Sequence, residues 1–191
     1  MSCSERRERE KKKVHDSIIN AALDIASKKG WHAVTIRKIA EAVEYAPPIV
    51  YQYFESKEAL FNELILMGMK MMHGNFDDAR KEHKDPKKIL LHLSLNHWHF
   101  AFKYRVLYKL MFSFERPIPN EEIRYIFGQI KSLFYELVDD EVLAHEIMFN
   151  WMCLQQGYIF NIMKIGLPPS LSSKQPEKLF KEAIERFIKA I

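Results

Sequence analysis

The sequence predicts an all-α protein in which a small front domain of three short helices precedes a larger helical domain. Three observations support this fold class. The chain of 191 residues has only six glycines, which leaves few positions for the tight turns of β-hairpins. Its 48% hydrophobic and 28% charged residues are typical of a globular protein with a core. Its eight prolines are grouped, and the segments between the groups are long enough for extended helices.

The front of the chain predicts three helices. The first runs from about residue 9 to residue 29, because apolar residues recur at helical spacing and Gly30 follows as a left-handed stop. Thr35 is suited to cap a second helix over 36–43. A third covers about 47–54. Helices this short bury little surface alone, so we expect the three to pack on one another.

The rest of the chain predicts longer helices, for about nine in all. Ser56 is a suitable cap for a fourth helix that continues to residue 84, and Gly68 and Gly74 inside it would allow a bend. We place the domain boundary here, so that the two domains are residues 1–56 and 57–191. Beyond Pro86 the expected helices are 87–115, 120–138, 140–165 and 176–190.

Composition and charge narrow the range of functions. The formal net charge is +4, and the excess of basic residues lies mainly in the first 57 residues, which favours a surface that meets phosphate. No apolar run is long enough to span a bilayer and the N-terminus is too charged for a signal peptide, so we expect a cytoplasmic protein. Two cysteines exclude a disulfide framework. Without paired Cys/His spacing, we predict no metal and no cofactor.

The linker between the second and third helices is unusual because it contains no glycine. Glu44 stands where glycine would normally supply a positive φ, so we expect strain there or another turn geometry. Ala46 offers no side-chain acceptor at the cap position. Pro47 and Pro48 compensate, because proline in the first helical turn removes N–H groups that a cap would otherwise satisfy. The expected result is a stiff, apolar helix tip.

The residues of this tip suggest contacts with duplex DNA. The rings of Pro47 and Pro48 can press against thymine methyl groups in a major groove, and Gln52 can read adenine. The hydroxyls of Tyr51 and Tyr53 suit phosphate oxygens.

Neighbouring residues could add backbone contacts. Lys57 opens the next helix, where its cation and free N–H groups suit a phosphate. Structural explanations compete with these contacts: Tyr53 could belong to the core and Arg37 could be an ordinary surface charge. The basic run at residues 6–13 is either a solvated helix start or an arm for the minor groove.

The segment "TIRKIAEAV" with the later "YQYFESKEALF" closely resembles the DNA-binding region of the TetR (AcrR-like) family of helix-turn-helix transcriptional regulators. The resemblance covers residues 14 to about 66, and it departs from the family pattern at Glu44, Tyr45 and Ala46. It implies that Thr35 and Arg37 approach phosphates and that Pro47, Pro48 and Gln52 face base edges. It also implies that Tyr51, Tyr53 and Lys57 contact the DNA backbone.

The resemblance further implies a repressor that binds a palindromic double-stranded DNA operator as a homodimer and is released by a small apolar or aromatic effector. Helices 140–165 and 176–190 would pair with their copies as a four-helix bundle, and residues 57–191 would form the domain for effector binding and dimerisation. Candidate residues for an effector pocket are His92, Asn96, Trp98, Phe102, Phe127, Met152 and Gln156.

Two other classes of function stay open at this point. The chain could be an all-helical adaptor that binds another protein. It could also be a cofactor-free helical enzyme, although the sequence offers no nucleophile with a base partner and no phosphate-binding loop. We therefore expect that the protein is not an enzyme.

Overall fold

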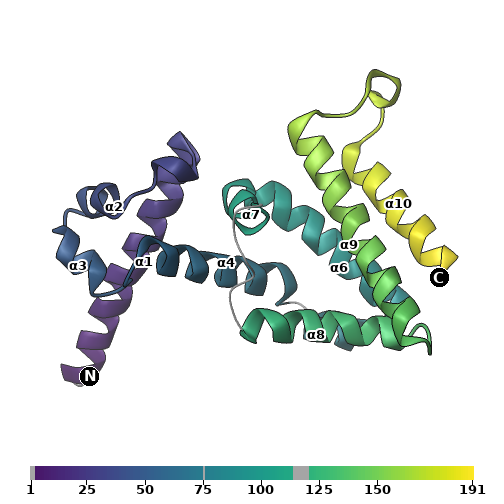
Figure 1. The fold of residues 1–191 in the computed structure, drawn as a ribbon, viewed down its shortest axis with the longest axis horizontal. Helices are drawn as coiled ribbons and strands as arrows, with labels where there is room; N and C mark the ends of the chain where they lie inside the picture. Colours follow the sequence, from purple (N-terminus) through teal and green to yellow (C-terminus); the bar gives the residue numbers. More distant parts are fainter. Residues whose placement is uncertain (1–2, 75, 114–120) are drawn as a thin grey trace. The chain divides into compact units, whose positions relative to one another are not determined.

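The computed structural model describes residues 3–74, 76–113 and 121–191, and every regular element in these ranges is helical. Ten α-helices and two short 3-10 helices follow one another along the described chain (Figure 1). The all-α prediction is therefore confirmed. None of the described helices is long and apolar enough to cross a membrane.

The chain divides into two compact units. The first contains the described residues up to Gly68 together with those from Val106 to residue 113. The second contains residues 69–105 and the described residues from 121 onward. The N-terminal unit thus extends past residue 56 and takes up most of the fourth helix.

The N-terminal unit is built from short helices that bury apolar stripes against one another. Its elements are α1 (Cys3–Lys29), η1 (Trp31–Ala33), α2 (Ile36–Ala42), α3 (Pro47–Tyr51), and most of α4 (Lys57–His73) and α7 (Arg105–Met111). Ile18, Ile39, Val50 and Leu64 are fully buried between them. The front three helices pack as predicted, with α2 lying against both α1 and α3.

The predicted helix over residues 57–84 is wrong, because the structure has two helices there. α4 ends at His73, Gly74 lies in a turn, and α5 (Phe76–Glu82) follows. The two acidic residues at the start of α5 suit the positive end of a new helix. Gly68 lies inside α4, where any Cβ would collide with the side chain of Met111, so this glycine permits the close approach of α7.

The predicted helix over residues 87–115 also divides. α6 (Pro86–Lys103) is capped by Asp85, whose side chain accepts a hydrogen bond from the backbone N–H of Lys87 at 2.9 Å. Tyr104 then leaves the helical conformation, with φ −115° and ψ 46°, and α7 begins at the next residue. Positions 114 and 115 of the prediction lie outside the described residues.

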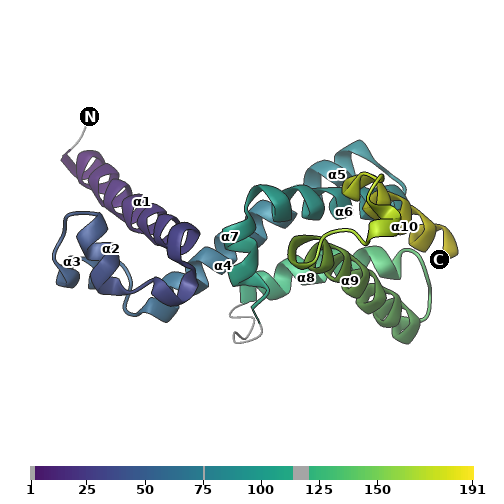
Figure 2. The same ribbon diagram turned by 90° about the horizontal axis from the view of Figure 1, so that it is seen from above.

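The C-terminal unit consists of packed helices around an aromatic core. Besides α5 and α6 it contains α8 (Glu121–Tyr135), α9 (Glu141–Lys164), η2 (Pro169–Leu171) and α10 (Pro176–Ala190). The bounds of α8, α9 and α10 lie within three residues of the predicted ones, of which position 120 lies outside the described residues, whereas η2 falls in a segment predicted as a loop. α9 and α10 lie side by side in both views (Figures 1 and 2), and α6 packs against both.

Aromatic rings fill the space between α6, α9 and α10. Phe180 is fully buried and stacks on Trp98, with ring centroids 4.9 Å apart. The indole N–H of Trp151 donates to the buried Ser94 hydroxyl at 3.0 Å, and that hydroxyl donates in turn to the Leu90 carbonyl at 2.7 Å. Each polar atom in this series of hydrogen bonds thus has a partner inside the core. A buried polar group without a partner would destabilise the fold.

Candidate nucleic-acid interface

The turn between α2 and α3 has the strained geometry that its sequence predicts. Glu44 adopts φ 59°, the left-handed region, and it is the one non-glycine residue to do so among the described residues. The Tyr45 N–H donates to the Ala40 carbonyl at 2.9 Å and closes the end of α2. Ala46 occupies the cap position without a side-chain hydrogen bond, and Pro47 begins the helix. The absence of glycine therefore strains one residue but leaves the turn intact.

Replacing Glu44 by glycine should stabilise the N-terminal unit by about 0.5 to 1 kcal/mol. An L-residue in the left-handed region costs roughly 1–2 kcal/mol, and the extra chain entropy of glycine offsets only part of this gain. Urea unfolding of Glu44→Gly and the wild type measures the change. Glu41→Gly is the matched control, because Glu41 lies inside α2 and its replacement should destabilise by about 1 kcal/mol. Equal destabilisation by both variants would contradict the strain at position 44.

α3 presents one face to the core and the other to solvent. Val50 is fully buried, and Ile49 is partly covered. The opposite face carries Pro47, Pro48, Tyr51 and Gln52, which are all exposed, with Tyr51 at 52%. The exposed residues are the ones that the sequence assigns to DNA contact, so the tip of α3 is free to enter a groove.

The remaining predicted contact residues flank this tip, and two of them also have structural roles. Thr35 is exposed, but its hydroxyl caps α2 by accepting from the Lys38 N–H at 3.3 Å. Tyr53 is half-buried, with its ring 6.5 Å from that of His15. Arg37 is exposed on α2.

Positive charge gathers at the start of α4. The ammonium group of Lys57 lies 5.0 Å from the centre of the Phe61 ring, a cation–π contact that orients this half-buried side chain. Lys57 lines a hollow of about 190 Å³ together with His32 and Lys109. Ser56 caps α4 through a 3.0 Å hydrogen bond from the Ala59 N–H. This end of α4 therefore has the charge and the geometry to hold a phosphate.

Tyr45 is a candidate contact residue that sequence reasoning missed. It lies in the turn before α3 and is 44% exposed. The sequence offers one signal for it, since a large aromatic residue stands where the turn usually has a small one.

The C-terminal unit contains a cavity of about 520 Å³ between the end of α4, α5 and α8. His73 is buried at its wall, and its Nδ1 has no hydrogen-bond partner among the described residues. Burial lowers the pKa of His73 to about 4, so its imidazole is neutral at pH 7. The other lining residues are Lys70, Gly74, Phe76, Asp77, Glu121, Glu122, Tyr125, Ile126 and Gln129. The wall thus combines the apolar surface of Phe76, Tyr125 and Ile126 with several charged and polar groups.

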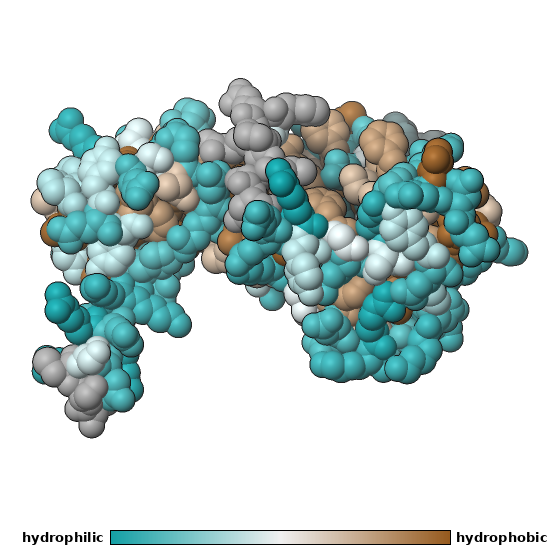
Figure 3. Space-filling model, turned by 60° about the horizontal axis from the view of Figure 1, so that its bottom comes forward, coloured by the Kyte–Doolittle hydropathy of each residue, from teal (hydrophilic) through white to brown (hydrophobic). Residues whose placement is uncertain are grey.

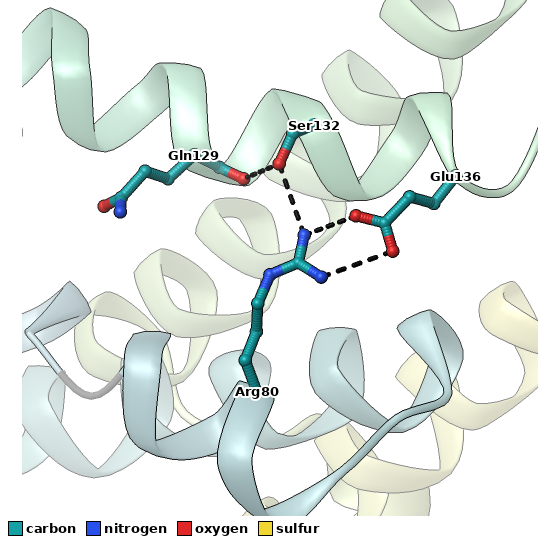
Figure 4. A network of polar contacts seen from close by, with 4 residues as sticks. All are labelled: Arg80, Gln129, Ser132 and Glu136. Carbon is teal, nitrogen blue, oxygen red and sulfur yellow. Dashed lines mark hydrogen bonds and ion pairs between the residues drawn. The ribbon is translucent and has the colours of Figure 1, made fainter.

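A polar network holds α5 against α8 next to this cavity (Figure 4). The guanidinium of Arg80 forms an ion pair with both carboxylate oxygens of Glu136 and donates to the Ser132 hydroxyl at 3.4 Å. The Ser132 hydroxyl donates to the Gln129 carbonyl at 2.7 Å, and Gln129 lines the cavity. Fork-shaped pairing of this kind fixes geometry as well as charge, so the cavity wall is well anchored.

The structure disperses the seven residues that the sequence proposes for an effector pocket, and none of them lines this cavity. Trp98 is buried, and its ring lies tilted against that of the half-buried Phe102, with centroids 4.3 Å apart. Gln156 is exposed on α9. The other positions are half-buried: His92 and Asn96 on α6, Phe127 on α8 with its ring 6.5 Å from that of His73, and Met152 on α9.

Three short helices with an exposed third helix after a tight turn define a helix-turn-helix protein. Residues 18–64 match the family model "Bacterial regulatory proteins, tetR family". This part of the chain therefore resembles the DNA-binding region of TetR-family regulators, as the motifs around α2 and α3 indicate.

A curated relative and several solved structures extend this comparison. The HTH-type transcriptional regulator UidR of Escherichia coli K12 is 34% identical over 59 residues, which cover 31% of this chain and 30% of UidR. The alignment thus spans about a third of each protein.

The fold likeness extends over nearly the whole chain. A TetR family transcription regulator from Marinobacter aquaeolei VT8 matches with a TM-score of 0.66 at 16% identity, covering 95% of this chain and 97% of that one. A TetR-family transcriptional regulator from Bordetella parapertussis 12822 matches with a TM-score of 0.64 at 17% identity, covering 91% and 93%. At such identities the likeness is one of fold. The relatives are named as regulators rather than as enzymes, in agreement with the non-enzymatic prediction.

Proposed function

We propose that this protein is a transcriptional repressor that binds a palindromic DNA operator as a homodimer and is released by a small molecule. The observation that carries the proposal is the exposed face of α3. Pro47, Tyr51 and Gln52 are exposed on it, while Val50 on the opposite face is fully buried. A helix anchored by one apolar face and free on the other fits the recognition helix of a helix-turn-helix protein.

The roles of the contact residues follow from their chemistry. The proline rings at positions 47 and 48 contact thymine methyl groups, and the Gln52 amide pairs with the edge of adenine. The Tyr51 hydroxyl and the Lys57 ammonium hold phosphates on either side of the groove. Arg37 adds a further cation, which makes the affinity depend on salt.

A stripe of exposed apolar residues on α9 supports the homodimer. Val142 is 75% exposed, Phe149 61% and Phe160 58%. Cys153 and Gln156 are also exposed and continue the same helical stripe. Apolar residues reach the surface among hydrophilic ones in the space-filling view of Figure 3. Large apolar side chains in a row along one helix mark an association surface, and a second copy of α9 and α10 would cover them as a four-helix bundle.

Introducing charge on this stripe should convert the dimer to a monomer. In Phe149→Glu with Phe160→Glu, two carboxylates would face their copies in an apolar interface, and we expect at least a 100-fold increase in the dimer dissociation constant. Sedimentation equilibrium measures it. Tyr125→Glu is the control, because Tyr125 is 69% exposed but lies on α8. A dimer unaffected by the double substitution would place the interface elsewhere.

The cavity beside His73 is the proposed effector site. The rings of Phe76 and Tyr125 and the side chain of Ile126 would contact the apolar or aromatic part of such a molecule, and Nδ1 of His73 would receive one of its hydrogen-bonding groups. α4 carries Lys57 at its first turn and Lys70 and His73 at its last. A displacement of its C-terminal end by the effector would therefore act on the same helix that holds DNA phosphate. A coupling of about 1–3 kcal/mol lowers DNA affinity 5- to 150-fold.

Selection of bound sequences from random duplex DNA tests this function. A dimer should select an inverted repeat whose half-sites lie about one helical turn apart or somewhat more, with affinity that falls as salt rises. A protein that binds every duplex equally at all salt concentrations, or selects no inverted repeat, would contradict the proposal.

A further inference from the structure

Two histidines and a glutamate meet where α5 joins α6. A carboxylate oxygen of Glu82 lies 3.8 Å from Nε2 of His83, and the other oxygen lies 3.7 Å from Nδ1 of His92. The two imidazole rings are 5.6 Å apart between centroids. One nitrogen from each histidine and one oxygen of Glu82 all lie within 4.8 Å of one another. Three ligand atoms of different residues therefore converge on one point.

The spacing of these atoms suits a small transition-metal ion. Zn²⁺ binds imidazole nitrogen at about 2.0–2.1 Å and carboxylate oxygen at about 2.0–2.2 Å. In a tetrahedral site this places neighbouring ligand atoms roughly 3.3 to 3.5 Å apart. The distances of 3.8 and 3.7 Å run to the two different carboxylate oxygens of Glu82, and one oxygen with both nitrogens lies within 4.8 Å. Side-chain rotations would therefore have to draw the three groups together onto one ion.

The backbone holds these ligands firmly. Glu82 is the last residue of α5, and the His83 N–H continues its hydrogen bonding by donating to the Ala79 carbonyl at 2.8 Å. His92 lies on α6, and the Asp85 cap fixes the start of that helix. The side chains of His83 and His92 are 26% and 25% exposed. The imidazoles are thus partly shielded, while Glu82 at 63% leaves the site open to solvent.

We propose that Glu82, His83 and His92 form a binding site for a divalent transition-metal ion of the Zn²⁺ type, with water as the remaining ligand. Two imidazoles and one carboxylate are the ligands that such ions prefer, whereas Mg²⁺ and Ca²⁺ require mostly oxygen. Glu82 is the last residue of α5, His83 follows it directly, and His92 lies on α6. An ion bound by all three residues would therefore link α5 to α6. The sequence-based prediction of no metal rested on the absence of paired Cys/His spacing. Spacing along the sequence does not reveal residues that the turn between α5 and α6 brings together.

Titration of the full-length wild-type protein with Zn²⁺ and Co²⁺ tests the site. We expect one ion per chain, visible d–d absorption of tetrahedral Co²⁺, and no binding of Mg²⁺ at the same concentrations. His92→Gln and Glu82→Gln should each weaken Zn²⁺ binding at least tenfold. His99→Gln is the matched control, because His99 lies on the same helix and pairs at 3.0 Å with the carboxylate of Glu177 instead.

Thermal unfolding in the presence of Zn²⁺ provides a second readout. The wild type should melt at a higher temperature as Zn²⁺ is added, because an ion that binds only the folded state stabilises it. His92→Gln should show no such rise, even if it melts lower without metal. Equal Zn²⁺ affinity in the wild type and His92→Gln, or loss of binding in His99→Gln alone, would overturn the proposal. DNA binding enters neither readout, so the result stands apart from the proposed repressor function.

Discussion

Replacing Tyr51 by alanine is expected to weaken operator binding about 10- to 100-fold without altering the fold. Tyr51 is 52% exposed, so its removal leaves no cavity, while a hydrogen bond to a charged phosphate contributes roughly 1.5–3 kcal/mol. Because the phosphate backbone is the same in every sequence, the loss should be similar for specific and nonspecific DNA. Fluorescence anisotropy with labelled duplexes measures the affinity.

Two comparisons make the Tyr51 result specific. Tyr125→Ala removes an exposed tyrosine, at 69%, from the C-terminal unit and should bind DNA like the wild type. Lys57→Ala should weaken binding and also reduce the salt dependence by about one phosphate contact, which removal of a neutral tyrosine should not do. Unchanged affinity in Tyr51→Ala, with an unchanged melting temperature, would show that α3 does not lie against DNA in the proposed manner.

Acid should unfold the C-terminal unit because two histidines are buried in it in their neutral form. Burial lowers the pKa of His73 to about 4. The pKa of His97 is lowered to about 3 by burial and by repulsion from His73, while a hydrogen bond with the Gln155 side chain partly opposes this shift. The unfolded chain takes up protons near the ordinary histidine pKa of 6.5, whereas the folded chain does not. Stability is therefore fully present above pH 6.5 and falls as the pH drops toward 4 and 3.

The expected loss of unfolding free energy per pH unit is large compared with the total stability of a typical domain. Each buried histidine contributes about 1.4 kcal/mol per pH unit, so the pair removes roughly 2 to 3 kcal/mol for each unit between about pH 6 and 4. Urea unfolding followed by circular dichroism at pH 7, 6 and 5 measures it. His97→Gln should lower the slope by about half, and the exposed His99→Gln should leave it unchanged. Equal slopes in all three proteins would mean that other groups cause the acid sensitivity.

Local sequence signals were sufficient to predict much of the N-terminal unit. Thr35 caps α2 as expected, Glu44 has the positive φ that a missing glycine requires, and the two prolines open α3. Each of these features depends on the conformation of one or two residues, which residue type largely determines. Exposure of Tyr51 follows from helical periodicity once Val50 is assigned to the core.

The C-terminal cavity could not be predicted in the same way because it depends on packing between distant segments. The sequence contains many aromatic residues, and of the selected ones Trp98 is buried in the core while Phe102 and Phe127 are half-buried. The cavity instead lies where α4 ends and α8 passes, at His73 and Tyr125. That place exists only because the chain breaks after His73, which the methionine-rich helical pattern of α4 concealed. A second turn, between α5 and α6, brings His83 toward His92.

The glycine at position 68 limits how this chain can change over evolution. The sulfur of Met111 occupies the space where a Cβ at that position would lie, and Leu107 borders it. Alanine or a larger residue there would require the side chain of Met111 to move aside or α7 to shift outward. Substitution at this one position would therefore change how α4 and α7 pack against each other.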